Sequence, residues 1–158
     1  MSNFVSLNGQ VHINADHTQS VQPYTEKPRF TDARNCEFFV PTFDTHSVLA
    51  LSNGMELFSS QTALEIMSAI AESREQAQHT ETGPVAINQH LTVDPSCIVA
   101  VFPCDRHFRE FVEEAHACEI YETCDTPNTL IVLDDETCLT VDVTPAELMD
   151  KLTKPRQA

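Results

Sequence analysis

The sequence predicts an α+β fold with an internal duplication, in which two small, mostly antiparallel β-sheet units each end in an α-helix. The first observation behind this prediction is a repeated helix start. TALEIMSAI (62–70) and TPAELMDKL (144–152) both begin with Thr, carry Glu three positions later, and place Ile or Leu at matching spacings. Thr at the N-cap with Glu at the third helical position forms a capping box, which favours the start of a helix.

The second observation is that shorter segments recur in the same order before these helices. With a shift of 80 residues, VSLN (5–8) matches VAIN (85–88) and VHIN (11–14) matches LTVD (91–94). With a shift of 82 residues, CEFF (36–39) matches CEIY (118–121) and SVLAL (47–51) matches TLIVL (129–133). The change of shift requires only a small length difference in one loop. Agreement in order, spacing and residue character indicates two copies of one unit, related by a pseudo-two-fold axis.

Each copy is predicted to contain the same series of elements. Alternating apolar residues indicate two short strands and a third one, then a hairpin, a last strand and the capped helix. In the first copy these lie at 4–7, 10–14 and 18–22, at 36–43 with 46–51, at 55–58 and at 62–73. In the second copy they lie at 84–87, 90–94 and 97–102, at 118–124 with 128–133, at 137–141 and at 144–152. The expected domains are therefore 1–73 and 84–154, joined by a linker at 74–83 and packed together as one body.

Matched apolar positions should bury matched faces of the two sheets. These positions are Leu49, Leu51 and Leu57 in the first copy and Ile131, Leu133 and Leu139 in the second. The copies should differ most between Pro103 and Cys118, where RHFREFVEEAHA (106–117) has the apolar spacing of a helix. We expect an inserted helix there, with Phe108 and Phe111 turned inward.

The first copy also carries marks of a known small unit. It has an LNG start (7–9), an N-x-D turn (14–16), the hydrophobic strand SVLAL, an N-G hairpin (53–54) and a terminal helix with EIMSAI (65–70). In these features it resembles the short FlbD family of flagellar operons. The resemblance covers about half of the chain, or all of it if both copies count, although the second copy lacks LNG and NG. It implies a small sheet-plus-helix unit with a non-enzymatic accessory role.

Acidic residues dominate the charge of the chain. The 158 residues include 24 Asp and Glu against 9 Lys and Arg, which gives a net charge of −15. From Glu110 to Asp150 there are twelve carboxylates and no Lys or Arg. Such a surface repels nucleic-acid phosphates, so direct binding of DNA or RNA is disfavoured. Because there is no membrane-spanning apolar run and no secretory signal, we expect a cytoplasmic protein that does not contact a membrane.

Catalysis is not expected, and no cofactor is predicted. The chain has no GxSxG motif and only three Gly, so the backbone freedom that phosphate-binding loops need is scarce. One zinc site is conceivable, because Cys104 and His107 with His116 and Cys118 would supply two Cys and two His. We favour the alternative that these residues are reduced core thiols and surface histidines, and hence that no metal is bound.

The base-free stretch contains the candidate site. On the strand at 118–124, Glu119, Tyr121 and Thr123 should share the outward face, while Cys118 and Ile120 turn inward. The residues expected to meet a partner are Glu113, Glu114, Glu119, Glu122, Asp125, Asp134, Asp135 and Glu136. Carboxylates spaced along a strand and a hairpin tip would imitate a row of phosphates, although such a charge run can also serve solubility alone.

We therefore expect an acidic, non-enzymatic interaction protein that binds and inhibits or modulates a basic protein partner, such as a nucleic-acid-binding protein of a host. By type, this resembles small acidic phage-encoded inhibitors, including nucleic-acid mimics. The alternative is a small-molecule binding protein that holds a metabolite or a nucleotide signal between the repeats or across a homodimer. A pseudo-symmetric seam is a natural place for such a pocket.

Overall fold

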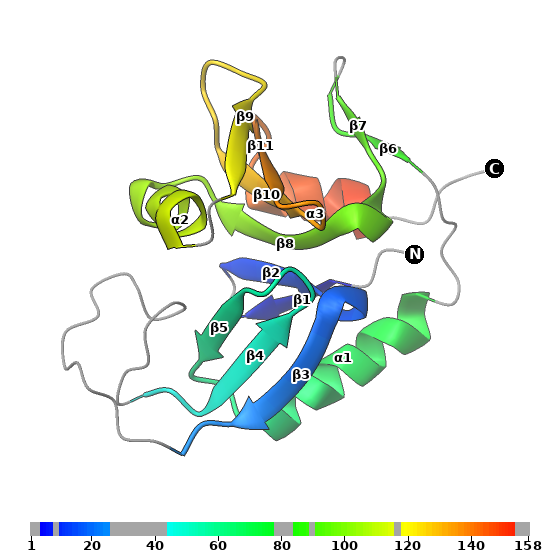
Figure 1. The fold of residues 1–158 in the computed structure, drawn as a ribbon. Coiled ribbons are helices and arrows are strands. Elements are labelled where there is room, and N and C mark those ends of the chain that lie inside the picture. Colours follow the sequence, from blue (N-terminus) through cyan, green and yellow to red (C-terminus); the bar gives the residue numbers. More distant parts are fainter. Residues whose placement is uncertain are drawn as a thin grey trace.

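The computed structural model describes residues 4–7, 10–25, 44–77, 84–88, 91–115 and 118–153. In these residues the fold is mixed α+β, with strands in three sheets and three α-helices (Figure 1). The first half contains β1 (Phe4–Leu7), β2 (Val11–Asn14), the 3-10 turn η1 (Ala15–His17), β3 (Thr18–Pro23), β4 (Ser47–Leu51), β5 (Glu56–Ser59) and α1 (Ala63–Ala77). The second half contains β6 (Val85–Ala86), β7 (Thr92–Val93), the 3-10 turn η2 (Pro95–Cys97), β8 (Ile98–Pro103), α2 (Arg106–Glu110), the π-helical turn η3 (Phe111–Ala115), β9 (Glu119–Glu122), β10 (Thr129–Leu133), β11 (Thr137–Val141) and α3 (Pro145–Thr153).

The largest sheet combines strands from both halves. Its order is β1-β2-β8-β10-β11-β9, so β9 forms one edge. The strands β3, β4 and β5 form a separate antiparallel sheet, and β6 with β7 forms a short hairpin. Figure 1 shows β1 and β2 between the rest of the first half and β8. The two halves therefore meet through shared backbone pairing.

The strand pairings of the two halves follow one register. Each pair between β3 and β4 has a counterpart between β8 and β10 when 80 is added to the first residue and 82 to the second, as Val21–Leu49 and Val101–Ile131 illustrate. The pairs of β4 with β5 correspond to those of β10 with β11 when 82 is added to both residues. The two pairs of β6 with β7 correspond to pairs of β1 with β2 at a shift of 80 for both residues.

Hydrogen bonds outside the sheets also recur at equivalent positions. The Ser47 hydroxyl donates to the Gln61 carbonyl at 2.8 Å, and the Thr129 hydroxyl donates to the Val143 carbonyl at 2.6 Å. Each bond ties the first residue of a strand, β4 or β10, to the segment that leads into the terminal helix of that half. Buried hydroxyls at these positions are thereby satisfied, as buried polar groups usually are.

The two terminal helices begin with the predicted caps. The Thr62 hydroxyl accepts a hydrogen bond from the Glu65 N–H at 3.1 Å, and the Thr144 hydroxyl accepts one from the Glu147 N–H at 3.2 Å. The Glu147 carboxylate also accepts a bond from the Thr144 hydroxyl at 3.0 Å. Each cap satisfies a backbone donor that the first turn of a helix leaves unpaired.

Two clusters of buried side chains form the core. The first takes residues from both halves, including Leu7, Ile13, Leu49, Leu57, Ile66, Ala100, Phe102, Leu130 and Cys138. The second lies between α3, the β6–β7 hairpin and the large sheet, and includes Ile87, Val93, Ile98, Ile131, Leu148 and Leu152. Of the predicted core positions, Leu49, Leu51, Leu57 and Ile131 are buried, while Leu133 and Leu139 pack against the second cluster only in part.

The inserted helix predicted in the second half is confirmed. α2 and η3 lie in this segment, and Phe108 is buried where its ring stacks on Phe102 with centroids 5.3 Å apart. Val112 is fully buried, and Phe111 packs partly against the same cluster. The apolar face of the insertion therefore covers one face of the large sheet.

One predicted hairpin is wrong. The strand at 118–124 was expected to pair with 128–133, but β9 pairs in parallel with β11, with Glu119 opposite Thr137. The cause is that both edges of β10 are already taken, by β8 and by β11. The chain after β9 must therefore cross to reach β10, and β9 becomes an outer strand. The equivalent first-copy strand at 36–43 lies outside the described residues.

Candidate interaction surface

The structure brings four of the predicted acidic residues to one end of β9 and β11. Glu119 begins β9, and Asp134, Asp135 and Glu136 form the turn between β10 and β11. The Glu119 N–H donates to the Glu136 carbonyl at 3.2 Å, so strand and turn are in direct contact. All four side chains are exposed. We call these four residues the acidic turn.

Local hydrogen bonds fix the shape of the acidic turn. The Asp134 N–H donates to the Cys97 carbonyl at 2.9 Å, which ties the turn to the start of β8. Glu136 adopts a left-handed conformation with φ of 69°, which is uncommon for a residue other than glycine. The Asp135 carboxylate accepts hydrogen bonds from the Thr137 hydroxyl and, at 3.1 Å, from the Thr137 N–H. The turn therefore presents its charges from a defined backbone.

These contacts also stabilise negative charge. Hydrogen bonds from the hydroxyl and the backbone of Thr137 lower the pKa of Asp135 below its ordinary value. On the neighbouring strand, the hydrogen bond between the Tyr121 hydroxyl and the Glu119 carboxylate raises the pKa of Tyr121, and the charge of Glu119 adds to this effect. Tyr121 is 48% exposed, so its ring lies on the surface beside the acidic turn.

The alternation predicted for β9 is confirmed at its first three positions. Glu119 and Tyr121 are exposed, while Cys118, just before the strand, is buried and Ile120 packs against the first core cluster. Glu122 departs from this pattern, because it lies on the inward side of the alternation and is nevertheless exposed. An ion pair explains its position.

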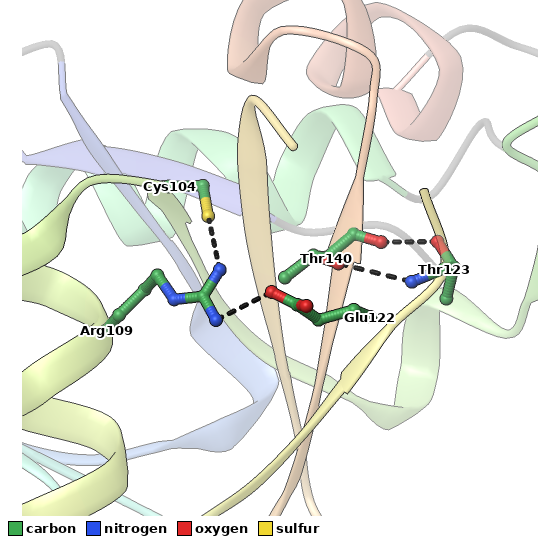
Figure 2. A network of polar contacts seen from close by, with 5 residues as sticks. All are labelled: Cys104, Arg109, Glu122, Thr123 and Thr140. Atoms are coloured by element: carbon green, nitrogen blue, oxygen red, sulfur yellow. Dashed lines mark hydrogen bonds and ion pairs between the residues drawn. The ribbon is translucent and has the colours of Figure 1, made fainter. Parts of the chain in front are cut away.

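Glu122 is engaged by a basic residue from the inserted helix (Figure 2). The Arg109 Nη2 atom lies 2.7 Å from Glu122 Oε1, and Nη1 donates to the Cys104 thiol sulfur at 3.8 Å. Burial raises the pKa of Cys104, and the neighbouring Arg109 opposes this rise. Arg109 directly precedes the base-free stretch, and sequence reasoning missed its role. Part of the negative charge of Glu122 is therefore compensated within the chain.

The remaining predicted residues, Glu113, Glu114 and Asp125, belong to other segments than the acidic turn. Asp125 is exposed in the loop after β9, which starts with the Thr123 N–H donating to the Thr140 hydroxyl at 3.2 Å. The Thr123 hydroxyl also donates to the Thr140 carbonyl, as Figure 2 shows. Glu113 is exposed on η3, and the side chain of Glu114 lies outside the described residues. The structure thus concentrates the predicted site on the acidic turn.

The conceivable zinc ligands do not meet in the described part of the chain. The Cys104 thiol contacts Arg109, whereas the buried Cys118 thiol is hydrogen-bonded to Cys138. The side chain of His107 and all of His116 lie outside the described residues. Within residues 4–7, 10–25, 44–77, 84–88, 91–115 and 118–153, no group of three or more His, Cys, Asp and Glu side chains could hold a metal ion.

Among the helices that the structure describes, none is long and apolar enough to cross a membrane. Comparison of the chain with protein-family models, with curated proteins and with solved structures found no match. We therefore argue function from the geometry and charge of the described residues.

Proposed function

We propose that this chain is an acidic, non-enzymatic interaction protein whose acidic turn docks on a basic macromolecular partner. The observation that carries the proposal is the gathering of Glu119, Asp134, Asp135 and Glu136 at one exposed corner of the large sheet. The sequence around them contains no Lys or Arg from Glu110 to Asp150. A partner that binds nucleic acid presents Lys and Arg spaced for phosphates, so the acidic turn acts as an inhibitor of the nucleic-acid-mimic type.

The backbone around the acidic turn supports this function. Because the turn is held to β9 and to the residue before β8 by backbone hydrogen bonds, its backbone loses little conformational entropy when a partner binds. The lowered pKa of Asp135 keeps that group ionised in mildly acidic solution. The Tyr121 ring beside the turn adds an aromatic group of the kind that is enriched in protein interfaces.

We also propose that the two halves are copies of one ancestral unit. Among the described residues the pairing of β2 with β8 is not repeated by β7 with β3, so the proposal concerns the unit and not a two-fold arrangement of the two copies. The shared register of three strand pairings supports this origin, as do the equivalent Ser47 and Thr129 hydrogen bonds. The inserted α2–η3 segment and the acidic turn belong to the second half. In the first half, the place of the acidic turn is taken by Ser52–Asn53–Gly54, which carries no charge. On this proposal, binding is a property that the second copy alone has acquired.

Neutralising the acidic turn tests the proposed function. In the test variant, Glu119→Gln, Asp134→Asn, Asp135→Asn and Glu136→Gln remove four charges while keeping the side-chain shapes. The matched control removes four exposed charges from the first half, at Glu56, Glu65, Glu72 and Glu75. Both variants have the same net charge, so any difference between them reports the location of the charges.

The probe is a peptide rich in Arg and Lys, titrated into each protein by calorimetry. We expect the test variant to lose at least about tenfold in affinity, because each interfacial charge pair contributes about 1 kcal/mol or more. The control variant should stay close to the wild type. Equal losses in the two variants would show that only net charge matters, and the proposed surface would then be wrong.

A small-molecule function is the second candidate. A hollow of about 380 Å³ lies on the outer face of the β3–β4–β5 sheet, lined among others by Tyr24, Glu56 and Phe58. The rings of Tyr24 and Phe58 meet edge to face with centroids 5.6 Å apart. Native mass spectrometry of the protein purified from its natural source distinguishes the candidates, since a bound metabolite supports this one.

A further inference from the structure

One edge of the first-half sheet has no partner strand among the residues that the structure describes, and we call it the open edge of β3. In the described residues β3 pairs with β4 and with no other strand. A groove of about 310 Å³ runs between β3 and α1, lined on the strand by residues 18–21 and on the helix by Met67, Ile70 and Arg74. Met67 is 48% exposed there, which is unusual for a large apolar side chain.

The equivalent edge of the second half is filled. β8 pairs with β10 on one side and with β2 on the other, through His12–Val101 and Ile13–Ala100. Met149, the counterpart of Met67 on α3, packs against the second core cluster, and so does Phe4 of β1. The β1–β2 hairpin therefore covers the edge of β8, whereas the equivalent edge of β3 has no partner strand in the described residues.

The chain also contains a counterpart of β2, the strand β7, whose outer edge has no partner in the described part of the chain. Thr92 and Val93, which form β7, stand where His12 and Ile13 stand in β2, and in the described residues β7 pairs only with β6. Figure 1 shows the β6–β7 hairpin and β3 on opposite sides of the β2–β8 junction. In this view, β7 and β3 of one molecule are therefore separated by that junction.

We propose that β7 of one molecule adds to the open edge of β3 in a second copy of this chain. The strands run antiparallel, with Thr92 opposite Val21 and Val93 opposite Ser20, as His12 and Ile13 lie opposite Val101 and Ala100 within one chain. The proposal rests on the proposed equivalence of the two halves and is independent of the acidic turn. Strand addition of this kind supplies backbone hydrogen bonds at a sheet edge.

The charges at the two edges are compatible with this contact. Two chains of net charge −15 repel each other, but β3 (TQSVQP) and β7 (TV) contain no charged residue. Asp94 follows β7 directly, and the pairing brings it toward the groove that Arg74 lines. Because each molecule offers one β7 and one β3, the contact is heterologous, and it closes into a ring or continues into a longer assembly.

The first test measures the mass of the full wild-type chain. Size-exclusion chromatography with light scattering, at micromolar concentration and about 0.15 M salt to screen the repulsion, should give at least twice the monomer mass. A monomer under these conditions overturns the proposal.

The second test fixes the register. A Val21→Cys chain and an isotope-labelled Thr92→Cys chain are mixed and mildly oxidised, since facing residues of an antiparallel pair have Cα atoms about 4.5–5.5 Å apart, within disulfide reach. We expect a covalent dimer, and peptide mapping should identify a disulfide between the two introduced cysteines. The matched control uses Gln22→Cys in place of Val21→Cys, one residue out of register, and should give no link above the background of the native thiols.

Two results of the second test would overturn the proposal. The first is equal linkage with Gln22→Cys, and the second is an assembled chain that forms no link between positions 21 and 92. A chain that carries both Val21→Cys and Thr92→Cys gives a third such result if its link forms only within a single chain. None of these results bears on peptide binding by the acidic turn, so failure here and failure of the proposed function are distinguishable.

Discussion

The buried thiols of Cys118 and Cys138 should make the free energy of unfolding fall as the pH becomes alkaline. Burial raises the pKa of both groups, and their mutual contact adds to the rise at Cys138. The unfolded chain loses these protons near pH 9, whereas the folded chain keeps them. Stability is therefore complete below about pH 9 and falls above it, by at most about 1.4 kcal/mol per pH unit for each thiol.

Urea denaturation between pH 8 and 10.5 measures this effect. A Cys118→Ala, Cys138→Val variant is expected to show a flatter decline of the unfolding free energy than the wild type, because it has lost both titrating groups. Parallel declines in the two proteins would contradict the assignment of the effect to these thiols.

His12 should make the protein sensitive to mild acid. It lies on β2 opposite Val101, at the junction of the two halves, and burial lowers its pKa. The unfolded chain takes up this proton near pH 6.5 while the folded chain resists it, so stability is lost as pH falls below that value. Thermal unfolding from pH 7.5 to 5 should show a smaller fall for His12→Gln than for the wild type. An identical pH profile would exclude His12 as the source.

Single residues show how far sequence reasoning reached toward the candidate site. The outward direction of Glu119 and Tyr121 followed from strand alternation, which is a local property, and it is confirmed. The pairing of Glu122 with Arg109 was missed, because it joins a helix to a strand, and the residue spacing within either element does not show which side chains meet between them. Its only sequence signal is that Arg109 stands directly before the base-free stretch. The compensated charge of Glu122 is the reason that the test variant leaves this residue unchanged.

At the scale of elements, the two 3-10 turns offer a matched pair of caps. The Asn14 side chain accepts from the Asp16 N–H at 3.0 Å, and the Asp94 side chain accepts from the Ser96 N–H at 3.0 Å. Asn14 also donates to the Ile98 carbonyl of the other half at 2.8 Å, an interaction that a carboxylate cannot make.

Replacing each cap with Ala separates these roles. We expect Asn14→Ala to lower the unfolding free energy by about 2–3 kcal/mol, because the turn loses its cap and the Ile98 carbonyl loses its hydrogen-bond donor. Asp94→Ala should cost about 1 kcal/mol. Chemical denaturation measures both values, and equal losses would show that the bond between the halves contributes little.

The elements were predictable where their signals are local. Caps and apolar spacing located both terminal helices, and apolar spacing alone located the inserted helix around Phe108. The partner of β9 was not predictable in this way, because alternation identifies a strand without identifying its neighbour. Its pairing with β11 is decided by competition for the edges of β10, which is a property of the whole sheet.

At the scale of the whole molecule, comparison of the chain with itself gave the most information. The offsets of 80 and 82 residues seen in the sequence are the offsets that relate the strand pairs of the two halves. The pairing of β2 with β8 was not predicted, because the pattern within each half is complete without it. Contacts between halves depend on shape and on which edges remain open, and a repeat pattern does not encode these directly.

Net charge acts at this same scale, and it sets how the molecule meets others. A chain of −15 approaches basic partners faster than neutral ones and is repelled by nucleic acid. In the proposed function, the location of the acidic turn on a fixed corner decides which part of a partner it covers. The central claim is that this corner competes with nucleic acid for a basic surface.

Displacement of DNA measures this competition most directly. A fluorescent duplex is bound to a basic DNA-binding protein from the organism that encodes the chain, and its anisotropy is followed as the chain is added. The wild type and the first-half control variant are predicted to release the duplex at similar concentrations. The variant neutralised at Glu119, Asp134, Asp135 and Glu136 is predicted to require at least about tenfold more protein. Release of the duplex by all three proteins at one concentration, or by none of them, would contradict the claim.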